Sequence, residues 1–487
     1  MSIDQRQAPL WQALCASAES PQAAFHTPGH KKGRGLSASV LAQLGAAFGQ
    51  MDLPELPELD NLFAPESVIQ EAQALAAVLF GAEHTWFLTN GSTAGILAAI
   101  LATCGPGDQI IMPRNVHQSV ISGLILSGAT PIFVQPPVDR DLNLVHCLTP
   151  EQVQQALVQF PQTKAVLLVY PTYEGICGNV AAIATLAHNH GIPLLVDEAH
   201  SPHFAFHPEL PQPALAAGAD LAVQSTHKML GAVTQAAMLH VQGNRIEPYR
   251  ISQALQLVQS TSPNYLLLAS LDAARQQMAL YGKPLMEQVL RLADRARTQL
   301  QALPHYPIAN PIETAPGCIT LDRTRLTLPT YLFGGQGYWL DQTLIATYGV
   351  TAELVTPDHL TFLIGLGNTD ADIDQLLLAC RALYQPTSRS SSLNTPPKIE
   401  ERPGISRPAL SPRDAYWSAS EVVALPEAVD RISAESICPY PPGIPLLLPG
   451  ERIRSQDLVQ LLHLKESGGV VTGCHDLSLK TLKVVRK

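Results

Sequence analysis

Between about residues 66 and 242, short apolar runs alternate with stretches that have helical spacing. The apolar runs are typical of buried strands and lie at residues 109–112, 130–134, 165–169, 194–196 and 221–223. Between several of them, Ala- and Leu-rich stretches predict helices at residues 71–80, 95–101 and 182–190. Alternating strand and helix patterns predict βαβ units and therefore a mostly parallel central sheet.

The remainder of the chain predicts a smaller α/β domain and a separate carboxyl-terminal domain. A long helical region at 264–303 precedes further strands at 318–322 and 360–364 and helices at 338–348 and 371–383. The Ser- and Pro-rich stretch 385–408 has almost no apolar periodicity, which is typical of an exposed linker. Apolar runs return at 445–448 and 470–471.

These patterns divide the chain into five parts. They are an amino-terminal segment (1–65), a large α/β domain (66–285), a small α/β domain (286–385), a linker (386–412) and a carboxyl-terminal α+β domain (413–487).

Composition narrows the class of protein. Hydrophobic residues make up 46% of the 487 residues and charged residues 15%, which is a globular composition with enough apolar side chains for a large core. The net charge of −10 and the lack of a basic block argue against a nucleic-acid partner. No signal peptide is expected, because residues 1–21 are polar and have no apolar h-region. No membrane span is expected, because no apolar stretch of about 18 residues occurs. Eight scattered cysteines without a C-x-x-C pair predict reduced thiols in a cytoplasmic protein.

Lys228 and Asp197 carry the strongest chemical signal. Each directly follows or ends an apolar run, and loops at the carboxyl ends of parallel strands are where α/β folds bind their ligands. Alone, Lys228 would be a surface charge and Asp197 a helix cap or loop anchor. Together they match the needs of pyridoxal 5′-phosphate (PLP), which takes a lysine for its imine and a carboxylate to keep its pyridine nitrogen protonated.

The segment Asn90-Gly91-Ser92-Thr93 has the composition of a phosphate-binding loop. It lies between the strand-like residues 86–88 and the predicted helix. Glycine permits close backbone approach, and the free N–H groups of a helix amino terminus suit a dianionic phosphate. The alternative is an ordinary helix cap by Ser92 or Thr93.

Histidines add to this pattern. His117 follows the strand at 110–112, where a planar ring could stack on the cofactor, although a lone histidine is more often structural. His200, His203 and His207 are loosely spaced like metal ligands, but no cysteine or second cluster supports them. We therefore expect no metal.

Taken together, these blocks resemble the Orn/Lys/Arg decarboxylase family, a branch of the aspartate-aminotransferase-like (fold type I) PLP enzymes. The similar blocks run through most of the chain, at residues 25–33, 59–62, 80–82, 89–93, 114–117, 171–175, 196–200, 225–228, 440–445 and 449–451. The length resembles that of the shorter members, which lack the amino-terminal regulator-like domain of the inducible acid-stress forms.

The resemblance implies a role for each matching position. Lys228 would form the imine with PLP, Asp197 would pair with the pyridine nitrogen, and His117 would stack on the ring. His200 would lie close to the ring. The phosphate would be held by Gly91, Ser92, Thr93, Ser225 and His227. One departure is Gln118, where relatives often have lysine.

The implied reaction is decarboxylation of a basic L-amino acid. Lys228 or His227 would return a proton to Cα after CO2 leaves. Arginine is favoured, giving agmatine for polyamine synthesis, with lysine or ornithine next. The acidic candidates for the distal cation are Glu174, Glu435 and Glu451. The resemblance also implies a homodimer or larger assembly, with active sites at the interface and residues 26–33 near the partner's cofactor.

Two alternatives stay open at this point. Another reaction on the same fold, such as transamination or carbon–carbon cleavage, is possible because fold does not fix function. An aminotransferase usually keeps a small-domain arginine for the substrate α-carboxylate, and Arg323 and Arg325 are available. A non-catalytic binding protein is the second alternative, although Lys228 and Asp197 are both present.

Overall fold

The computed structural model describes residues 4–139, 142–303, 315–335, 337–385 and 404–486. The chain forms two compact units, Met1–Ala102 with Leu195–Met286, and Thr103–Leu194 with Glu287–Lys487. Over the described ranges, none of the helices combines the length and the apolar character that crossing a bilayer requires.

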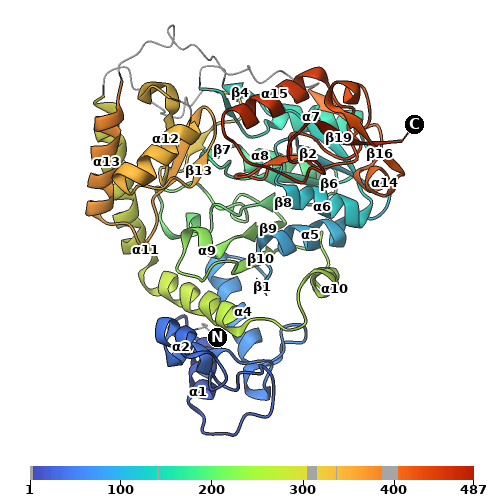
Figure 1. The fold of residues 1–487 in the computed structure, drawn as a ribbon. Helices are drawn as coiled ribbons and strands as arrows, with labels where there is room; N and C mark the ends of the chain where they lie inside the picture. Colours follow the sequence, from blue (N-terminus) through green and yellow to red (C-terminus); the bar gives the residue numbers. More distant parts are fainter. Residues whose placement is uncertain (1–3, 140–141, 304–314, 336, 386–403, 487) are drawn as a thin grey trace. The chain divides into compact units, whose positions relative to one another are not determined.

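Buried strands form the centre of the first unit (Figure 1). They lie in the order β1 (His84–Leu88), β10 (Ala237–Val241), β9 (Leu221–Gln224) and β8 (Leu194–Asp197). β8 and β9 are parallel, whereas β10 runs antiparallel to both β9 and β1. The apolar runs at 194–196 and 221–223 are thus confirmed as strands, while β10 was not predicted. Since β8 and β9 are parallel, the residues after them emerge at the same edge.

Helices of the first unit cover these strands and follow local sequence signals. They are α4 (Val68–Phe80), α5 (Gly91–Thr103), the short α9 (Thr226–Met229) and α10 (Pro248–Val258), with a 3-10 turn at Phe204–Phe206. The carboxylate of Asp60 fixes the start of α4, because it accepts the N–H groups of Ser67 (2.8 Å) and Ile69 (3.1 Å). α4 ends at Gly81, whose left-handed conformation closes the helix.

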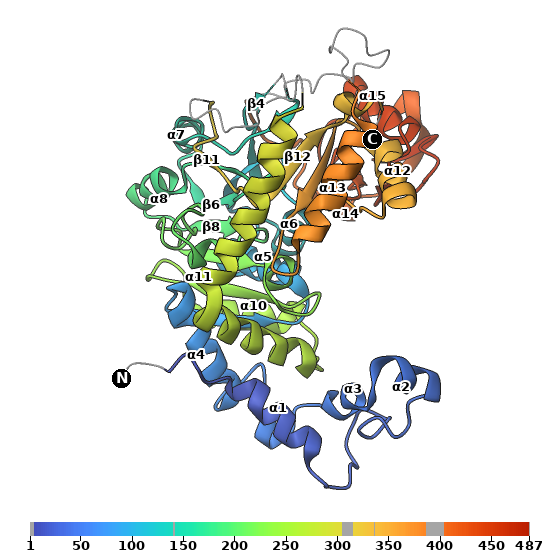
Figure 2. The same ribbon diagram turned by 90° about the vertical axis from the view of Figure 1, so that its left-hand side faces the viewer.

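The amino-terminal part of the first unit is helical. It contains α1 (Pro9–Glu19), α2 (Ala38–Leu44), α3 (Ala46–Met51) and a 3-10 turn at Pro57–Leu59 (Figure 2). α1 buries Leu10 and Leu14 completely. Its first turn is anchored to the long helix α11 (Tyr265–Gln301), because Asp272 accepts the N–H of Leu10 at 3.0 Å. Only the part of α11 up to Met286 belongs to this unit.

The second unit has its own set of mostly parallel strands. β6 (Thr163–Val169), β2 (Gln109–Pro113) and β3 (Thr130–Val134) are parallel, and β15 (Ile405–Ser406) adds an antiparallel edge. Helices α6 (Gln118–Ser127), α7 (Pro150–Gln159) and α8 (Val180–Asn189) belong to this part. Two residues of the predicted linker are therefore an edge strand, while its residues 386–403 lie outside the described part of the chain.

A second sheet of this unit consists of β12 (Arg325–Pro329), β14 (His359–Leu363) and β13 (Leu354–Val355). It is accompanied by α12 (Gly337–Thr343), a π-helical turn at Leu344–Tyr348, a 3-10 turn at Thr330–Phe333 and α13 (Asp370–Leu383). The predicted helices at 338–348 and 371–383 are confirmed. A capping box of Thr369 and Asp372 starts α13. The predicted strand at 318–322 is shorter, since only β11 (Thr320–Leu321) pairs with β7 (Ile176–Cys177).

The carboxyl-terminal residues of this unit have a small core of their own. The elements are α14 (Pro412–Trp417), β16 (Ser420–Ala424) paired with β19 (Thr481–Val485), a 3-10 turn at Leu425–Ala428, β17 (Cys438–Pro439) paired with β18 (Val471–Thr472), and α15 (Ser455–Glu466). The apolar run 445–448 forms no named strand, only a bridge between Leu447 and Ile437. Elsewhere in the unit, β4 (Val138–Asp139) pairs with β5 (Leu144–Val145).

Candidate active site

Lys228 and His200 meet at the strand edge of the first unit. Lys228 lies on α9, directly after β9, and His200 lies three residues after β8. The lysine Nζ is 2.9 Å from Nε2 of the buried His200 ring. Two motifs that are 28 residues apart in the sequence therefore form one contact, as expected for neighbouring parallel strands.

Asp197 ends β8 in the same region. Its side chain is buried, and its register partner across the sheet is Val223 on β9. Burial raises the pKa of Asp197, whereas the positive charge of Lys228 and the N–H of Ala199 oppose that rise. A buried carboxylate of this kind gains most from a positively charged hydrogen-bond donor, which a protonated pyridine nitrogen would supply.

The predicted phosphate loop lies beside the lysine segment. Ser225 Oγ donates to Ser92 Oγ at 2.8 Å. Gly91 begins α5 with a φ of +72°, a conformation that favours glycine. The first N–H groups of any α-helix lack intrahelical acceptors, so those of α5 are suited to an anion. The two serines and Gly91 are thus brought together as predicted from the motifs.

Gly95 explains how α5 can lie so close to the strands. A Cβ at this position would be 2.6 Å from Val223 on β9 and 2.8 Å from Leu88 on β1. Any larger residue would push the amino terminus of α5 away from β9, the strand that precedes Lys228. Residue 95 was predicted only as the start of the helix 95–101, and the available signal for this role is a second glycine four residues after Gly91.

His227 turns its ring toward the backbone. Nδ1 donates to the carbonyl of Ala236 at 3.0 Å, which places a proton on Nδ1. Its backbone N–H also donates to Ala236 (3.2 Å). His227 is therefore fixed relative to the chain that returns from the lysine segment into β10.

The other candidate metal ligands of this region have separate structural contacts. His203 packs its ring on Phe204, with the centroids 4.9 Å apart. His207 accepts the N–H of Glu209 at 3.2 Å. Within the described ranges, no group of three or more His, Cys, Asp or Glu side chains is arranged to hold a metal ion.

Glu198 is a buried acid that the sequence analysis did not single out. It accepts the N–H of Ala214 and the Nε2 of Gln224, both at 2.8 Å. Burial raises its pKa to about 7. The only signal in the sequence was its position next to Asp197 at the end of a buried run.

In the second unit, His117 caps α6. Its Nδ1 accepts the N–H of Ser119 at 3.2 Å. Its Nε2 lies next to Gly443, where a Cβ would approach to 3.0 Å, and Gln118 donates its N–H to the Gly443 carbonyl at 2.9 Å. The loop around Gly443 thus packs directly on His117. The stacking of His117 on a cofactor stays a prediction.

A cavity of about 340 Å³ in the second unit contains one of the three candidate carboxylates. Its lining includes Tyr173, Glu174, Asp358, Pro442 and His463. Tyr173 donates its hydroxyl to the Pro442 carbonyl at 2.9 Å, which joins the cavity wall to the loop that packs on His117. Burial raises the pKa of Glu174, and hydrogen bonds from its own backbone and from Thr172, followed by the charges of Arg325 and His146, partly offset this rise.

The other two candidates, Glu435 and Glu451, are engaged by their own surroundings. Glu451 forms two 2.8 Å hydrogen bonds with the buried guanidinium of Arg114. Glu435 accepts the backbone N–H groups of His475 (2.5 Å) and Lys483 (3.0 Å). Neither is in the lining of the 340 Å³ cavity. Their geometry is that of residues that stabilise the carboxyl-terminal fold.

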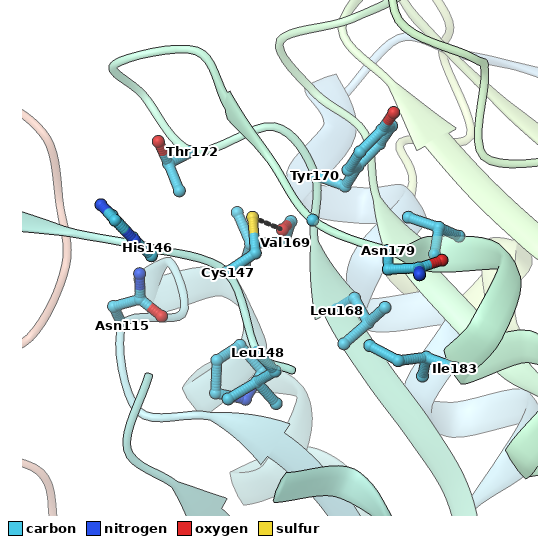
Figure 3. Close-up of a pocket in the computed structure, with 13 residues that line it drawn as sticks. Asn115, His146, Cys147, Leu148, Leu168, Val169, Tyr170, Thr172, Asn179 and Ile183 are labelled. Carbon is cyan, nitrogen blue, oxygen red and sulfur yellow. Dashed lines mark hydrogen bonds between the residues drawn. The ribbon is translucent and has the colours of Figure 1, made fainter. Parts of the chain in front are cut away.

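A second cavity lies beneath Thr172 (Figure 3). It measures about 10 Å³, the size of one water molecule. Asn115 and Cys147 point into it in Figure 3, and the buried Oδ1 of Asn115 has no partner among the described protein atoms. Burial raises the pKa of Cys147 to about 12, so this thiol is a poor nucleophile. The cavity suits an ordered water and not a substrate.

The two small-domain arginines have structural surroundings. Arg325 is 1% exposed and packs against Gly175, where a Cβ would be 2.8 Å from its Cγ. Arg323 pairs with Asp294 on α11 at 3.0 Å. Arg325 is buried and Arg323 is already paired, so neither is presented here as an open clamp for a carboxylate, which weakens one support for the aminotransferase alternative.

Comparison with known proteins places these features in a family context. The major-domain model of Orn/Lys/Arg decarboxylases matches residues 8–321, and the C-terminal-domain model matches residues 401–470. An arginine decarboxylase of Bacillus subtilis is 36% identical over 486 residues, covering 100% of this chain and 99% of that protein.

Solved structures agree with the fold. A lysine decarboxylase of Francisella novicida has a TM-score of 0.82 at 22% identity, covering 98% of this chain and 81% of that chain. A structure of SPT with PLP has a TM-score of 0.52 at 17% identity, covering 78% of this chain and 86% of that chain. The architecture is therefore an α/β fold type I PLP fold with a mixed, mostly parallel sheet and a carboxyl-terminal domain.

Proposed function

Because this chain belongs to the Orn/Lys/Arg decarboxylase family, we propose that it uses PLP to convert L-arginine to agmatine and CO2. The observation that carries the proposal is the contact of Lys228 with His200 beside the buried Asp197. Arginine is chosen over lysine and ornithine because the full-length similarity is to an arginine decarboxylase. Agmatine from this reaction would feed polyamine synthesis.

The residues of the first unit fit PLP. Lys228 supplies the amine for covalent attachment, and Asp197 supplies the buried carboxylate for the pyridine nitrogen. The hydroxyls of Ser92 and Ser225, only 2.8 Å apart, and the amino terminus of α5 suit the phosphate. When bound, PLP supplies an electron-accepting ring that takes up the electron pair released as the bond from Cα to the carboxylate breaks.

Lys228 and His200 can share a proton. An ammonium cannot act as a nucleophile, and an imidazole 2.9 Å away is a suitable acceptor for its proton. The same lysine, or His227, would return a proton to Cα after CO2 has left. Burial raises the pKa of Asp197, and a protonated pyridine nitrogen facing this carboxyl would favour its ionised form in turn.

The surroundings of Arg323 and Arg325 favour decarboxylation over transamination. A carboxylate that is to leave as CO2 gains little from a strong guanidinium clamp, since such a clamp stabilises the charged ground state. Arg325 is buried against Gly175, and Arg323 is paired with Asp294. Both are therefore assigned to the structure of the small domain.

For the distal cation of the substrate, we favour Glu174. It lines the large cavity of the second unit, whereas Glu435 and Glu451 do not. A guanidinium presents parallel N–H donors that match the two oxygens of a carboxylate. Glu174 would therefore bind arginine better than the shorter, single-point cation of ornithine.

We further propose that the enzyme is a homodimer or larger and contains residues 26–33 at its interface. Lys32 Nζ donates to the carbonyls of Ser17 (2.7 Å) and Ser20 (2.9 Å), which fixes this segment on the end of α1. The neighbouring Phe25 is 93% exposed. Deleting residues 1–33 should weaken the dimer and lower turnover together, as measured by sedimentation and activity on one sample. A fully active monomer would refute this assembly. The cytoplasmic location stays a prediction.

Product analysis tests the reaction itself. The purified enzyme with PLP is incubated separately with arginine, lysine and ornithine, and the products are identified by mass spectrometry. We expect agmatine and CO2 from arginine, with kcat/KM for the other two lower by about tenfold or more. A keto acid product would indicate an aminotransferase, and cadaverine as the main amine would shift the substrate to lysine.

A further inference from the structure

Thr89, the residue before the phosphate loop 90–93, has both of its backbone groups bound by glutamine side chains. Its N–H donates to Oε1 of the buried Gln259 at 2.9 Å, and its carbonyl accepts from Nε2 of Gln235. The pairing of β1 with β10 ends one residue earlier, at Leu88. The two side chains therefore fix the backbone where the sheet no longer does.

Gln235 also connects the phosphate loop to the lysine segment. Its φ of +85° is uncommon for a residue with a side chain, and such conformations concentrate at functional sites. A Cβ at Gly91 would be 3.9 Å from the Gln235 carbonyl oxygen. The next carbonyl, that of Ala236, accepts the ring Nδ1–H of His227 at 3.0 Å. Residues 235 and 236 thus touch both halves of the cofactor site.

The segment that follows Gln259 also contacts the loop. The residue after it, Ser260, donates its N–H to the Asn90 side chain at 3.4 Å, and Asn90 Oδ1 also accepts from the Thr89 hydroxyl at 3.3 Å. The loop entrance is consequently held by two chain segments that are remote in sequence. Neither glutamine belongs to the motifs on which the family resemblance is based.

We propose that Gln235 and Gln259 are positioning residues that hold loop 90–93 in the conformation that binds the phosphate of PLP. A loop that is fixed before binding loses little conformational entropy when the phosphate arrives. The glutamines act through Thr89 and need not touch the cofactor. The inference rests on the proposed use of PLP and adds the residues that determine its affinity.

The test compares two ligands on the apoprotein, PLP and pyridoxal. Both carry the aldehyde and the ring, but pyridoxal has no phosphate. In Gln235→Ala, the affinity for PLP should fall about tenfold, the scale of one lost hydrogen bond, while that for pyridoxal stays within about twofold. Gln259→Ala should behave in the same way.

Gln242→Ala is the matched control. Its Nε2 donates to the carbonyls of Leu215 and Ala219, both at 2.7 Å, so the substitution removes the same kind of bond in the same unit away from the loop. It should lower thermal stability and leave the ratio of PLP to pyridoxal affinity unchanged. Gln235→Gly relieves the left-handed backbone while removing the amide, and it should weaken PLP binding as Gln235→Ala does.

Several results would overturn the positioning role. They are unchanged PLP affinity in Gln235→Ala, equal losses for PLP and pyridoxal, or Gln235→Gly that binds PLP like the wild type. If Gln235→Ala does not fold, Gln235→Gly and Gln259→Ala decide the question by the same ratio. A wild-type apoprotein that binds pyridoxal as tightly as PLP would instead refute the proposed cofactor, and this inference with it.

Discussion

Lys228 in the first unit and Arg114 in the second are both cations close to buried acids. They differ in whether the cation can transfer a proton to the group that it contacts. Arg114 donates two hydrogen bonds to Glu451 and others to the carbonyls of Pro445 and Leu446. Lys228 instead contacts an imidazole nitrogen at 2.9 Å. Arginine cannot give up its proton in a protein, whereas a lysine next to an imidazole can. A permanent ion pair stabilises the fold, and an exchangeable proton permits chemistry.

The first experiment removes the side chain of Lys228, the cation that can give up its proton. Lys228→Ala should lower turnover by at least about 10³-fold, because it removes the proposed covalent attachment point and proposed proton donor together. Steady-state rates at saturating PLP measure this. Lys164→Ala, at an exposed lysine on β6, is the matched control and should keep its activity. Borohydride reduction and peptide mapping should place the label on Lys228, and a label on Lys164 or Lys283 would contradict the assignment.

The second experiment keeps the shape of the buried acid and removes its charge. Asp197→Asn should lower kcat by about 10²-fold or more while PLP still binds, because a charge-assisted hydrogen bond is lost. Asp220→Asn is the matched control, since Asp220 is also buried but pairs with Arg245 at 3.1 Å. It should reduce stability without a comparable loss of kcat. If Asp197→Asn retains more than half of the wild-type kcat, its proposed role at the pyridine nitrogen is wrong.

The third experiment compares two carboxylates of the second unit, one proposed to bind the substrate and one that stabilises the fold. Glu174→Gln should raise KM for arginine by about 10- to 100-fold with a small change in kcat, as expected for loss of a charged hydrogen bond to the substrate. Glu451→Gln should leave KM unchanged and destabilise the fold by about 3 kcal/mol, because it leaves Arg114 buried without its counter-charge. A KM increase in Glu451→Gln alone would reverse the two assignments.

The sequence predicts which residues lie near Lys228 better than which carboxylates are already engaged in the second unit, and the reason is physical. Lys228, Asp197 and Ser225 each lie within a few residues of a strand end, and parallel strands bring such ends to one edge. The partner of Glu451 is 337 residues away, so no local pattern could reveal that this carboxylate is already bound. β10 was not predicted, and its apolar run Ala237–Val241 is interrupted by His240, which the structure buries.

Residues that act by positioning the backbone also could not be predicted from the sequence. Gly95 is required by the close approach of α5 to Val223, which is a contact between distant segments. Gln235 has a left-handed backbone that is unusual for glutamine, so no propensity predicts it. By contrast, the helix at 371–383 was predictable, because Thr369 and Asp372 form a capping box from adjacent residues.

The smallest expected effect is on the pH dependence of stability, and it comes from Glu198, the neighbour of Asp197. The pKa of Glu198 is raised from the ordinary 4.5 to about 7, so between these values the folded protein binds a proton that the unfolded chain has lost. Stability therefore falls as pH rises from about 4.5 to 7, by at most about 3 kcal/mol. Glu198→Gln has no such proton, and its one amide oxygen can accept from only one of the two donors, Ala214 and Gln224, so its Tm should be lower at every pH. The apparent Tm of wild type should thus drop more than that of Glu198→Gln between pH 5.5 and 8, by a few degrees. If the plots of apparent Tm against pH are parallel for the two proteins, then Glu198 has an ordinary pKa and its burial does not contribute to the pH dependence of stability.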